Sequence, residues 1–243
     1  MLRSSFVHYI LFLVLFLTIP SQIIGQSTDY SKIFNRWDDA VEWLNENKSW
    51  MKELCDEYDV DYEMATTIVF PELLRYSRYR NVLETLANKA LYIQFGSEYS
   101  NFSVGVFQIK PSFVEDLLFS NELSKGKLYD ILNIKEDYDD DTELREEIVY
   151  ALQSEKSAFR FVIAFMKICE KRYKIEDFDE YEKVVFMSTV YNAGLKTKQE
   201  DVSDISSEKH FNDRLITDQY YSYSDVALWY YKFYRSGKKF IIV

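Results

Sequence analysis

The sequence predicts a mainly α-helical protein, and three observations support this. Glycine and proline account for nine of the 243 residues, about 4%, whereas an average protein contains roughly 12%. Folds built from strands depend on these residues for their tight turns. Hydrophobic residues make up 47% of the chain, enough for a sizeable core, and they recur mostly every three or four positions, which is the period of a helix.

The beginning of the chain is expected to be an export signal. An apolar run from Phe6 to Ile19 follows a single arginine and is short for a bilayer span. The mature chain is expected to begin near Gln26, and an uncleaved anchor is the alternative because Ile23 is bulkier than the residue preferred there. We therefore expect an exported protein, periplasmic or secreted, without a stable membrane span once the signal is removed.

The first helices are expected within residues 36–58, where the periodicity predicts a helical pair with acids on the side opposite the apolar residues. Asp61 can cap the following helix, which carries an apolar stripe that leads to Glu72. Pro71 has no backbone donor, so we expect this helix to kink or restart immediately before Glu72. The helical pattern then continues to residue 93.

The next part of the chain alternates loop and helix. The stretch from Gly96 to Pro111 is typical of a loop, and helical spacing resumes from Phe113 to Leu123. A run of acids from Glu136 to Glu147 could be a calcium loop, but the order of the carboxylates does not match an EF-hand. We therefore expect a solvated, acidic helix start.

The last part of the chain is expected to be helical as well. Two strongly apolar helices are predicted at residues 148–170 and 180–192, the second ending at Gly194 as a capping glycine would. Most tyrosines of the tail from Phe211 to Val243 are expected on a core-facing aromatic helix.

No repeat or low-complexity linker divides the mature chain. We therefore expect a signal peptide at residues 1–25, a helical extension at residues 26–60 that packs on the main domain, and the main domain at residues 61–243. The two cysteines, Cys55 and Cys169, leave two possibilities. Export permits a disulfide between them, and two buried, inert thiols are the alternative. The spacing of the two cysteines specifies neither a metal site nor a disulfide framework.

Composition excludes several function classes. The chain carries 40 acidic and 29 basic residues, a net charge of −11, which is the wrong sign for binding nucleic acid through its phosphates. His210 is the only histidine after the signal, so a multi-histidine metal site is not expected. No Walker loop or GxGxxG segment is present to hold a nucleotide. The sequence thus predicts neither a metal nor a cofactor.

Three short motifs contain four of the few glycines and prolines. They read FPELLRY at residues 70–76, SVGVFQIKP at residues 103–111 and VYNAG at residues 190–194. Taken together and in this order, they resemble the lytic transglycosylases of the lysozyme-like superfamily, which cleave bacterial peptidoglycan. The resemblance implies a lysozyme-like helical domain in which Glu72 is the catalytic acid. It implies substrate contacts from Gly105, Phe107, Gln108, Tyr191 and Asn192.

The chain also departs from the family's pattern. The family places Ser-x-Phe after its glutamate, whereas Leu73-Leu74-Arg75 follows Glu72 here. Glu72 and Gln108 stand 36 positions apart, which indicates an insertion between the first two motifs. The resemblance therefore implies a divergent branch.

The chemistry of Glu72 supports the same interpretation independently. Its stripe also holds Met64 and Ile68, so its carboxyl group is expected to be partly desolvated, which favours the protonated form of a general acid. A transglycosylase needs no second carboxylate if a hydroxyl of the sugar itself is the nucleophile. We expect Tyr191 to orient Glu72 through a hydrogen bond, and the amide of Gln108 to bind the sugar.

The predicted function is cleavage of the β-1,4 bond between N-acetylmuramic acid and N-acetylglucosamine with formation of a 1,6-anhydro ring. Peptidoglycan glycan strands are the expected partner, and the sequence identifies no protein partner. Two alternatives stay open. One is a muramidase that hydrolyses the same bond, and the other is a non-catalytic glycan-binding envelope protein, which the altered residues after Glu72 motivate.

Overall fold

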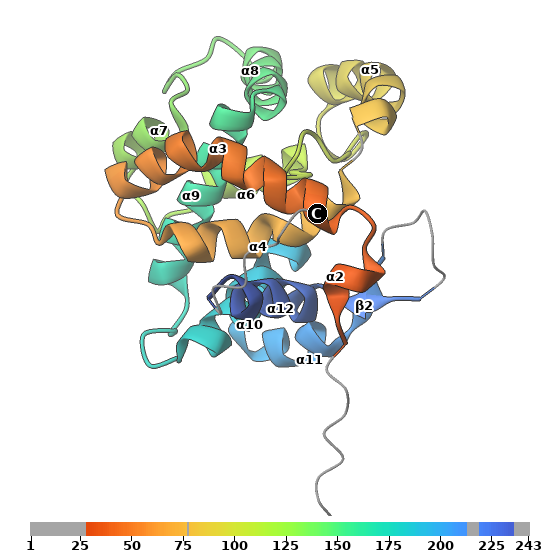
Figure 1. The fold of residues 1–243 in the computed structure, drawn as a ribbon. Helices are drawn as coiled ribbons and strands as arrows, with labels where there is room; N and C mark the ends of the chain where they lie inside the picture. The colour runs from red at the N-terminus through yellow and green to blue at the C-terminus, as the bar shows by residue number, and fades with distance from the viewer. Residues whose placement is uncertain (1–27, 77, 213–218, 236–243) are drawn as a thin grey trace, which may run out of the picture.

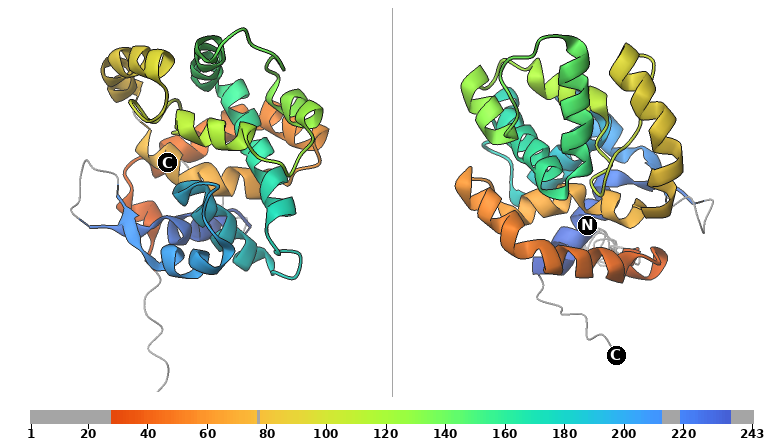
Figure 2. Two further views of the ribbon diagram at one scale, coloured as in Figure 1. Left: turned by 180° about the vertical axis from the view of Figure 1, so that it is seen from behind. Right: turned by 90° about the horizontal axis from the view of Figure 1, so that it is seen from above.

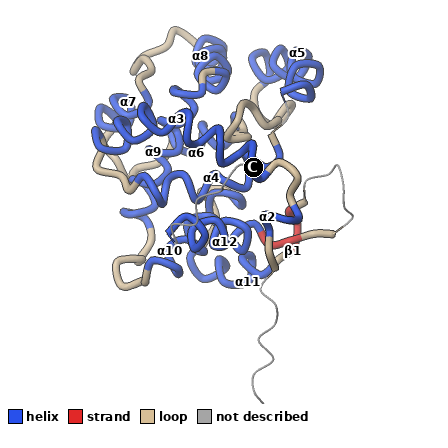
Figure 3. Tube along the Cα trace, in the orientation of Figure 1, coloured by secondary structure: helices blue, strands red, loops and turns tan. Residues whose placement is uncertain are grey.

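The computed structural model describes residues 28–76, 78–212 and 219–235, and these are mainly helical, as predicted (Figure 1). Figure 3 shows the two short strands at one edge, near the first described helix. The expected signal peptide at residues 1–25 lies outside the described residues. In the part of the chain that is described, no helix is long and apolar enough to cross a membrane.

The elements follow one another in a simple order. The helices are α2 (Tyr30–Ile33), α3 (Trp37–Glu57), α4 (Tyr62–Arg75), α5 (Arg78–Phe95), α6 (Pro111–Leu118), α7 (Lys125–Leu132), α8 (Asp141–Gln153), α9 (Glu155–Arg172), α10 (Glu180–Ala193), the 3₁₀ turn η1 (Gln199–Asp201), α11 (Val202–Ser207) and α12 (Tyr223–Arg235). The strands β1 (Lys209–Phe211) and β2 (Tyr221–Ser222) pair antiparallel. Most buried apolar side chains from α2 to α12 belong to one hydrophobic cluster.

The N-terminal helix α3 is a single unbroken helix, so the predicted helical pair within residues 36–58 is wrong. This segment contains no glycine or proline that would interrupt it. Trp37 is 1% exposed, and the centroid of its ring lies 4.6 Å from that of Phe70 on α4 and 4.8 Å from that of Trp229 on α12. The aromatic contacts therefore hold α3 against the helix that carries Glu72.

Helix α4 begins as predicted but does not restart before Glu72. The side chain of Asp61 accepts a hydrogen bond from the backbone N–H of Met64 at 2.7 Å, which confirms the predicted cap. The helix then runs through Pro71 without a break. Phe70, next to the proline, stacks on the ring of Tyr230 with 3.7 Å between centroids. We attribute the continuity to this packing, which offsets the hydrogen bond lost at Pro71.

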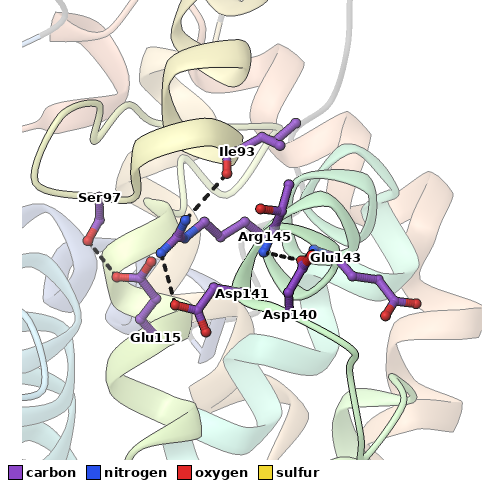
Figure 4. Close-up of polar contacts among 8 residues, drawn as sticks. Ile93, Ser97, Glu115, Asp140, Asp141, Glu143 and Arg145 are labelled. Atoms are coloured by element: carbon purple, nitrogen blue, oxygen red, sulfur yellow. Dashed lines mark hydrogen bonds and ion pairs between the residues drawn. The ribbon is translucent and has the colours of Figure 1, made fainter.

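Polar contacts attach α5 and the loop that follows it to α8 and α6 (Figure 4). Ser97 donates a hydrogen bond to Glu115 of α6 at 2.5 Å, and Arg145 of α8 donates to the backbone carbonyl of Ile93 at 3.4 Å. The same guanidinium lies 3.4 Å from the carboxylate of Asp141. The view from above shows α5 beside the helices around α8 (Figure 2), and the two helices are in contact. The segment between the first two motifs thus contains α5.

The helices after the loop differ from prediction at several positions. Helix α6 ends at Leu118, so the helical spacing predicted as far as Leu123 stops earlier, and α7 was not predicted. The predicted helix at residues 148–170 is two helices, because Ser154 ends α8 and its hydroxyl accepts a hydrogen bond from the N–H of Ser157 to begin α9. The acidic helix start is confirmed, since Asp140 caps α8 with its carboxylate. Helix α10 ends before Gly194, whose φ of 102° confirms the predicted C-terminal cap.

The described tyrosines of the tail mainly face the core, as predicted. Tyr223, Tyr230 and Tyr231 of α12 are buried, whereas Tyr220 is 51% exposed. Helix α12 packs on α4 and on α10, and these three helices surround Glu72.

The two cysteines are free thiols, and both are buried. Burial raises the pKa of Cys55 to about 12 and raises the pKa of Cys169 well above its ordinary value. The structure therefore corresponds to the second of the two alternatives, a pair of buried and inert thiols.

Candidate active site

Glu72 lies in the last turn of α4 and is only 7% exposed. Two buried phenols, Tyr191 of α10 and Tyr223 of α12, are close enough for the charge of Glu72 to act on them. Burial raises the pKa of both phenols well above the ordinary value, and the negative charge of Glu72 raises it further. A cation is also near, because Nη1 of Arg75 lies 3.7 Å from Oε2 of Glu72. The carboxylate is thus buried among two neutral phenols and one guanidinium.

The hydroxyl of each phenol donates a hydrogen bond to a backbone carbonyl. Tyr191 donates to the carbonyl of Phe107 at 3.0 Å, and Tyr223 donates to the carbonyl of Ile68 at 2.9 Å. Because a phenol has one O–H, the expected donation from Tyr191 to Glu72 is wrong. Tyr191 instead connects the end of α10 to the second motif, and Tyr223 fixes the helix that carries Glu72.

The second motif forms a tight turn. The backbone N–H of Val104 donates to the carbonyl of Ile109 at 2.9 Å, and Gly105 has a φ of 69°. A Cβ atom at Gly105 would lie 2.8 Å from the backbone oxygen of Leu152, a distance that forces a shift. The glycine is therefore required for the turn and for its contact with α8.

Gln108 closes this turn with its own side chain. It also has a positive φ, 49°, and its amide Nε2 donates to the carbonyl of Gly105 at 2.7 Å. Its side chain is partly exposed. One N–H of the carboxamide is thus used within the turn, and the amide oxygen and the second N–H are what it offers to a ligand.

Phe107 occupies the core. Its side chain is 0% exposed, and its ring makes an edge contact with Trp43 at 5.7 Å and a tilted contact with Phe159 at 5.5 Å between centroids. What Phe107 contributes to the site is its backbone carbonyl, the acceptor for Tyr191. A substrate contact through the Phe107 side chain does not fit this position.

A polar pocket lies beside Glu72. The empty space in and above it, open solvent at its mouth included, is about 380 Å³. Arg75 and Tyr223 belong both to its wall and to the surroundings of Glu72, and the exposed side chain of Asn192 lies at its margin. The remaining lining residues are Thr189, Ile205, Ser206, Glu208, His210, Phe211, Ser222 and Ser224.

The predicted site residues are thus only partly brought together. Tyr191 lies near Glu72, but neither residue lines the pocket, where Asn192 is the predicted site residue that is present. Gly105 and Gln108 are not among the lining residues either. The second motif is joined to the others through the hydrogen bond that Tyr191 donates.

Sequence reasoning missed Arg75 and Tyr223 as members of the site. The position of Arg75, three residues after Glu72 on one helix, was a usable signal, because such residues lie on the same face. Tyr223 carried no such signal. Its bond to Ile68 joins residues that are 155 positions apart.

The arrangement favours proton transfer by a single buried carboxyl group. Glu208, an acid that lines the neighbouring pocket, is paired with His210 at 2.8 Å. Across residues 28–76, 78–212 and 219–235, no group of three or more metal-ligating side chains could hold an ion. Comparison of the chain with family models, curated proteins and solved structures finds no match in any of the three.

Proposed function

We propose that this chain is an exported lytic transglycosylase that cleaves peptidoglycan, with Glu72 as its proton donor. The observation that carries the proposal is the convergence of the three motifs. The first supplies a buried glutamate, and the third supplies Tyr191 beside it. The second is bound to Tyr191 through the carbonyl of Phe107. Of three segments that resemble one enzyme family in sequence, the first and third thus meet at one carboxyl group, and the second is attached to the third by a hydrogen bond.

The proposed reaction uses that carboxyl group twice. Glu72 donates its proton to the oxygen that joins N-acetylmuramic acid to N-acetylglucosamine, and the bond between this oxygen and C1 of the muramoyl sugar breaks. The resulting carboxylate then takes the proton of the muramoyl C6 hydroxyl as its oxygen bonds to C1. The products are an N-acetylglucosamine end and a 1,6-anhydromuramoyl end, and Glu72 regains its proton.

The surroundings of Glu72 suit these steps in two ways. Its 7% exposure limits the access of water, which would otherwise compete with the sugar hydroxyl. The hydroxyls of the two phenols donate hydrogen bonds to backbone carbonyls, which fixes the walls of the site. The carboxyl group of Glu72 is then the group that transfers the proton to the substrate.

One observation favours a second candidate, a glycan-binding protein without turnover. The guanidinium of Arg75 lies 3.7 Å from Glu72, and a carboxylate paired with a cation is less available as a proton donor. The family that the motifs resemble has no arginine in its pattern at this position. A hydrolytic muramidase is the third candidate, and it differs from the first only in the nucleophile.

The experiment is digestion of purified peptidoglycan by the mature chain, beginning near Gln26, with mass spectrometry of the soluble products. The transglycosylase predicts muropeptides with a 1,6-anhydro end, which are one water lighter than hydrolysis products. Products of full mass would indicate a muramidase. Binding to the insoluble polymer without soluble products would indicate the glycan-binding protein and would overturn the proposal.

A further inference from the structure

Arg75 presents unused hydrogen-bonding capacity to the pocket beside Glu72. Its side chain is 24% exposed, and its guanidinium lies over the ring of Phe211, 5.3 Å from the centroid. Its nearest carboxylate oxygen, on Glu72, is 3.7 Å away, which is too long for a hydrogen bond. Within the part of the chain that the structure describes, none of its five N–H donors has a hydrogen-bond acceptor.

The other groups of the pocket wall do not compete for that capacity. Glu208 and His210 are paired with each other at 2.8 Å. The hydroxyls of Ser222 and Ser224 are directed to the backbone carbonyl of Ser206, at 2.6 and 3.1 Å. The two serines and the Glu208–His210 pair are thus engaged within the wall, and Arg75 is a cation of the wall with open donors.

The shape of the group indicates what it binds. A guanidinium is a planar fork that matches a carboxylate through two parallel hydrogen bonds. Stacking on Phe211 restricts the orientation of this fork, so less conformational freedom is lost when a ligand binds. A partly buried position strengthens such charge-assisted bonds relative to water.

We propose that Arg75 is a specificity-determining residue that binds a carboxylate carried by the muramic acid side of the substrate. The inference rests on the proposed function, because peptidoglycan supplies this carboxylate. Two sources share the chemistry. One is the peptide stem attached to muramic acid, and the other is the lactyl group of a muramic acid that has lost its peptide.

The test measures binding without turnover by isothermal titration calorimetry. Three disaccharides serve as probes, and none contains the bond that is cleaved. They are N-acetylglucosaminyl-N-acetylmuramic acid with its peptide stem, the same disaccharide with a free lactyl carboxylate, and di-N-acetylchitobiose, which has no carboxylate. Each is titrated into wild type, Arg75→Met and Arg75→Lys.

We expect wild type to bind at least one carboxylate-bearing probe about tenfold to a hundredfold more tightly than chitobiose, as charged hydrogen bonds do. Arg75→Met should lose this preference and keep its affinity for chitobiose. Arg75→Lys should keep part of the preference, because lysine retains the positive charge and loses only the planar pair of donors. Arg36→Met is the matched control. Arg36 stands directly before α3 and pairs with Asp39 of that helix, so removing its guanidinium should leave the preference unchanged.

The outcomes separate the two proposals. Preference for the stem-bearing probe assigns the carboxylate to the peptide, and preference for the other assigns it to the lactyl group. Equal binding of all three probes by wild type, or an unchanged preference in a folded Arg75→Met, overturns the role of Arg75 and leaves the proposed function intact. No binding of any probe overturns the proposed substrate class and the inference with it. Circular dichroism melting curves establish that each variant is folded.

Discussion

The hydroxyl of Tyr191 donates a hydrogen bond across 3.0 Å to the backbone carbonyl of Phe107, a residue 84 positions earlier in the chain. The ring of Tyr191 also makes edge contacts with Phe113 and Phe165, at 5.5 and 5.4 Å between centroids. The end of α10, which lies near Glu72, is therefore held against the turn at residues 105–108.

Tyr191→Phe removes this hydrogen bond and keeps the ring. We expect the free energy of unfolding to fall by about 1 to 2 kcal/mol, because the buried carbonyl of Phe107 loses its partner. Urea denaturation measures the change. Tyr150→Phe is the control, since Tyr150 is 77% exposed and its hydroxyl makes no comparable buried bond. Equal stability of the two variants would show that the bond to Phe107 contributes nothing.

Gly105→Ala should be strongly destabilising. The residue has a φ of 69°, and the new Cβ would lie 2.8 Å from a backbone oxygen that cannot rotate away. We expect a loss of about 2 kcal/mol or more in the free energy of unfolding.

Gly126→Ala is the matched control for this substitution. Gly126 lies in α7 with no atom within 4 Å of the added carbon, so alanine should stabilise the helix by about 0.5 to 1 kcal/mol. Thermal melts of both variants give the comparison. Similar melting temperatures would contradict the strained turn at Gly105.

The sequence predicted the features that depend on neighbouring residues. The cap at Asp61 and the helix end at Gly194 follow from side-chain and backbone preferences within one turn, and both are present. The continuity of α4 through Pro71 could not be predicted in the same way. It depends on the stacking of Phe70 against Tyr230, a contact between residues far apart in the chain.

The same limit applies to the site. Motif order predicted that Glu72 and Tyr191 would be neighbours, and the charge of Glu72 does reach the phenol. The direction of the Tyr191 proton, the approach of Tyr223 and the pocket between α10 and β2 depend on tertiary packing, which no local pattern encodes.

The two cysteines should be unreactive in the folded protein. Burial raises the pKa of Cys55 to about 12, so almost none of it is thiolate at neutral pH, and Cys169 is shifted in the same direction. We expect no labelling by a thiol reagent such as dithiobis(nitrobenzoate) in buffer at pH 7.5 and labelling of two thiols in denaturant. Rapid labelling of the native protein, or a disulfide found by mass spectrometry, would contradict this expectation.

Tyr30 should make the fold sensitive to alkaline pH. Burial is the main cause that raises its pKa from the ordinary 10.0 to about 12. The folded protein therefore holds the proton to higher pH than the unfolded chain does. This stabilisation is fully present below pH 10 and is lost as pH rises toward 12.

Comparison with Tyr30→Phe isolates the effect. Between pH 10 and 12, wild type should lose about 1 kcal/mol of stability per pH unit relative to the variant, as measured by melting temperature against pH. Parallel curves for the two proteins would show that Tyr30 titrates as it does in an unfolded chain.

The most direct test of the account is the rate of soluble muropeptide release from peptidoglycan by wild type, Glu72→Gln and Glu63→Gln. Glu63 lies in the first turn of the same helix and serves as the matched control. We predict anhydro-muropeptides from wild type, a similar rate from Glu63→Gln, and a rate about a hundredfold to ten-thousandfold lower from a folded Glu72→Gln, because the proton donor is lost. Equal release by wild type and Glu72→Gln, or no release by either, would contradict the central role of Glu72.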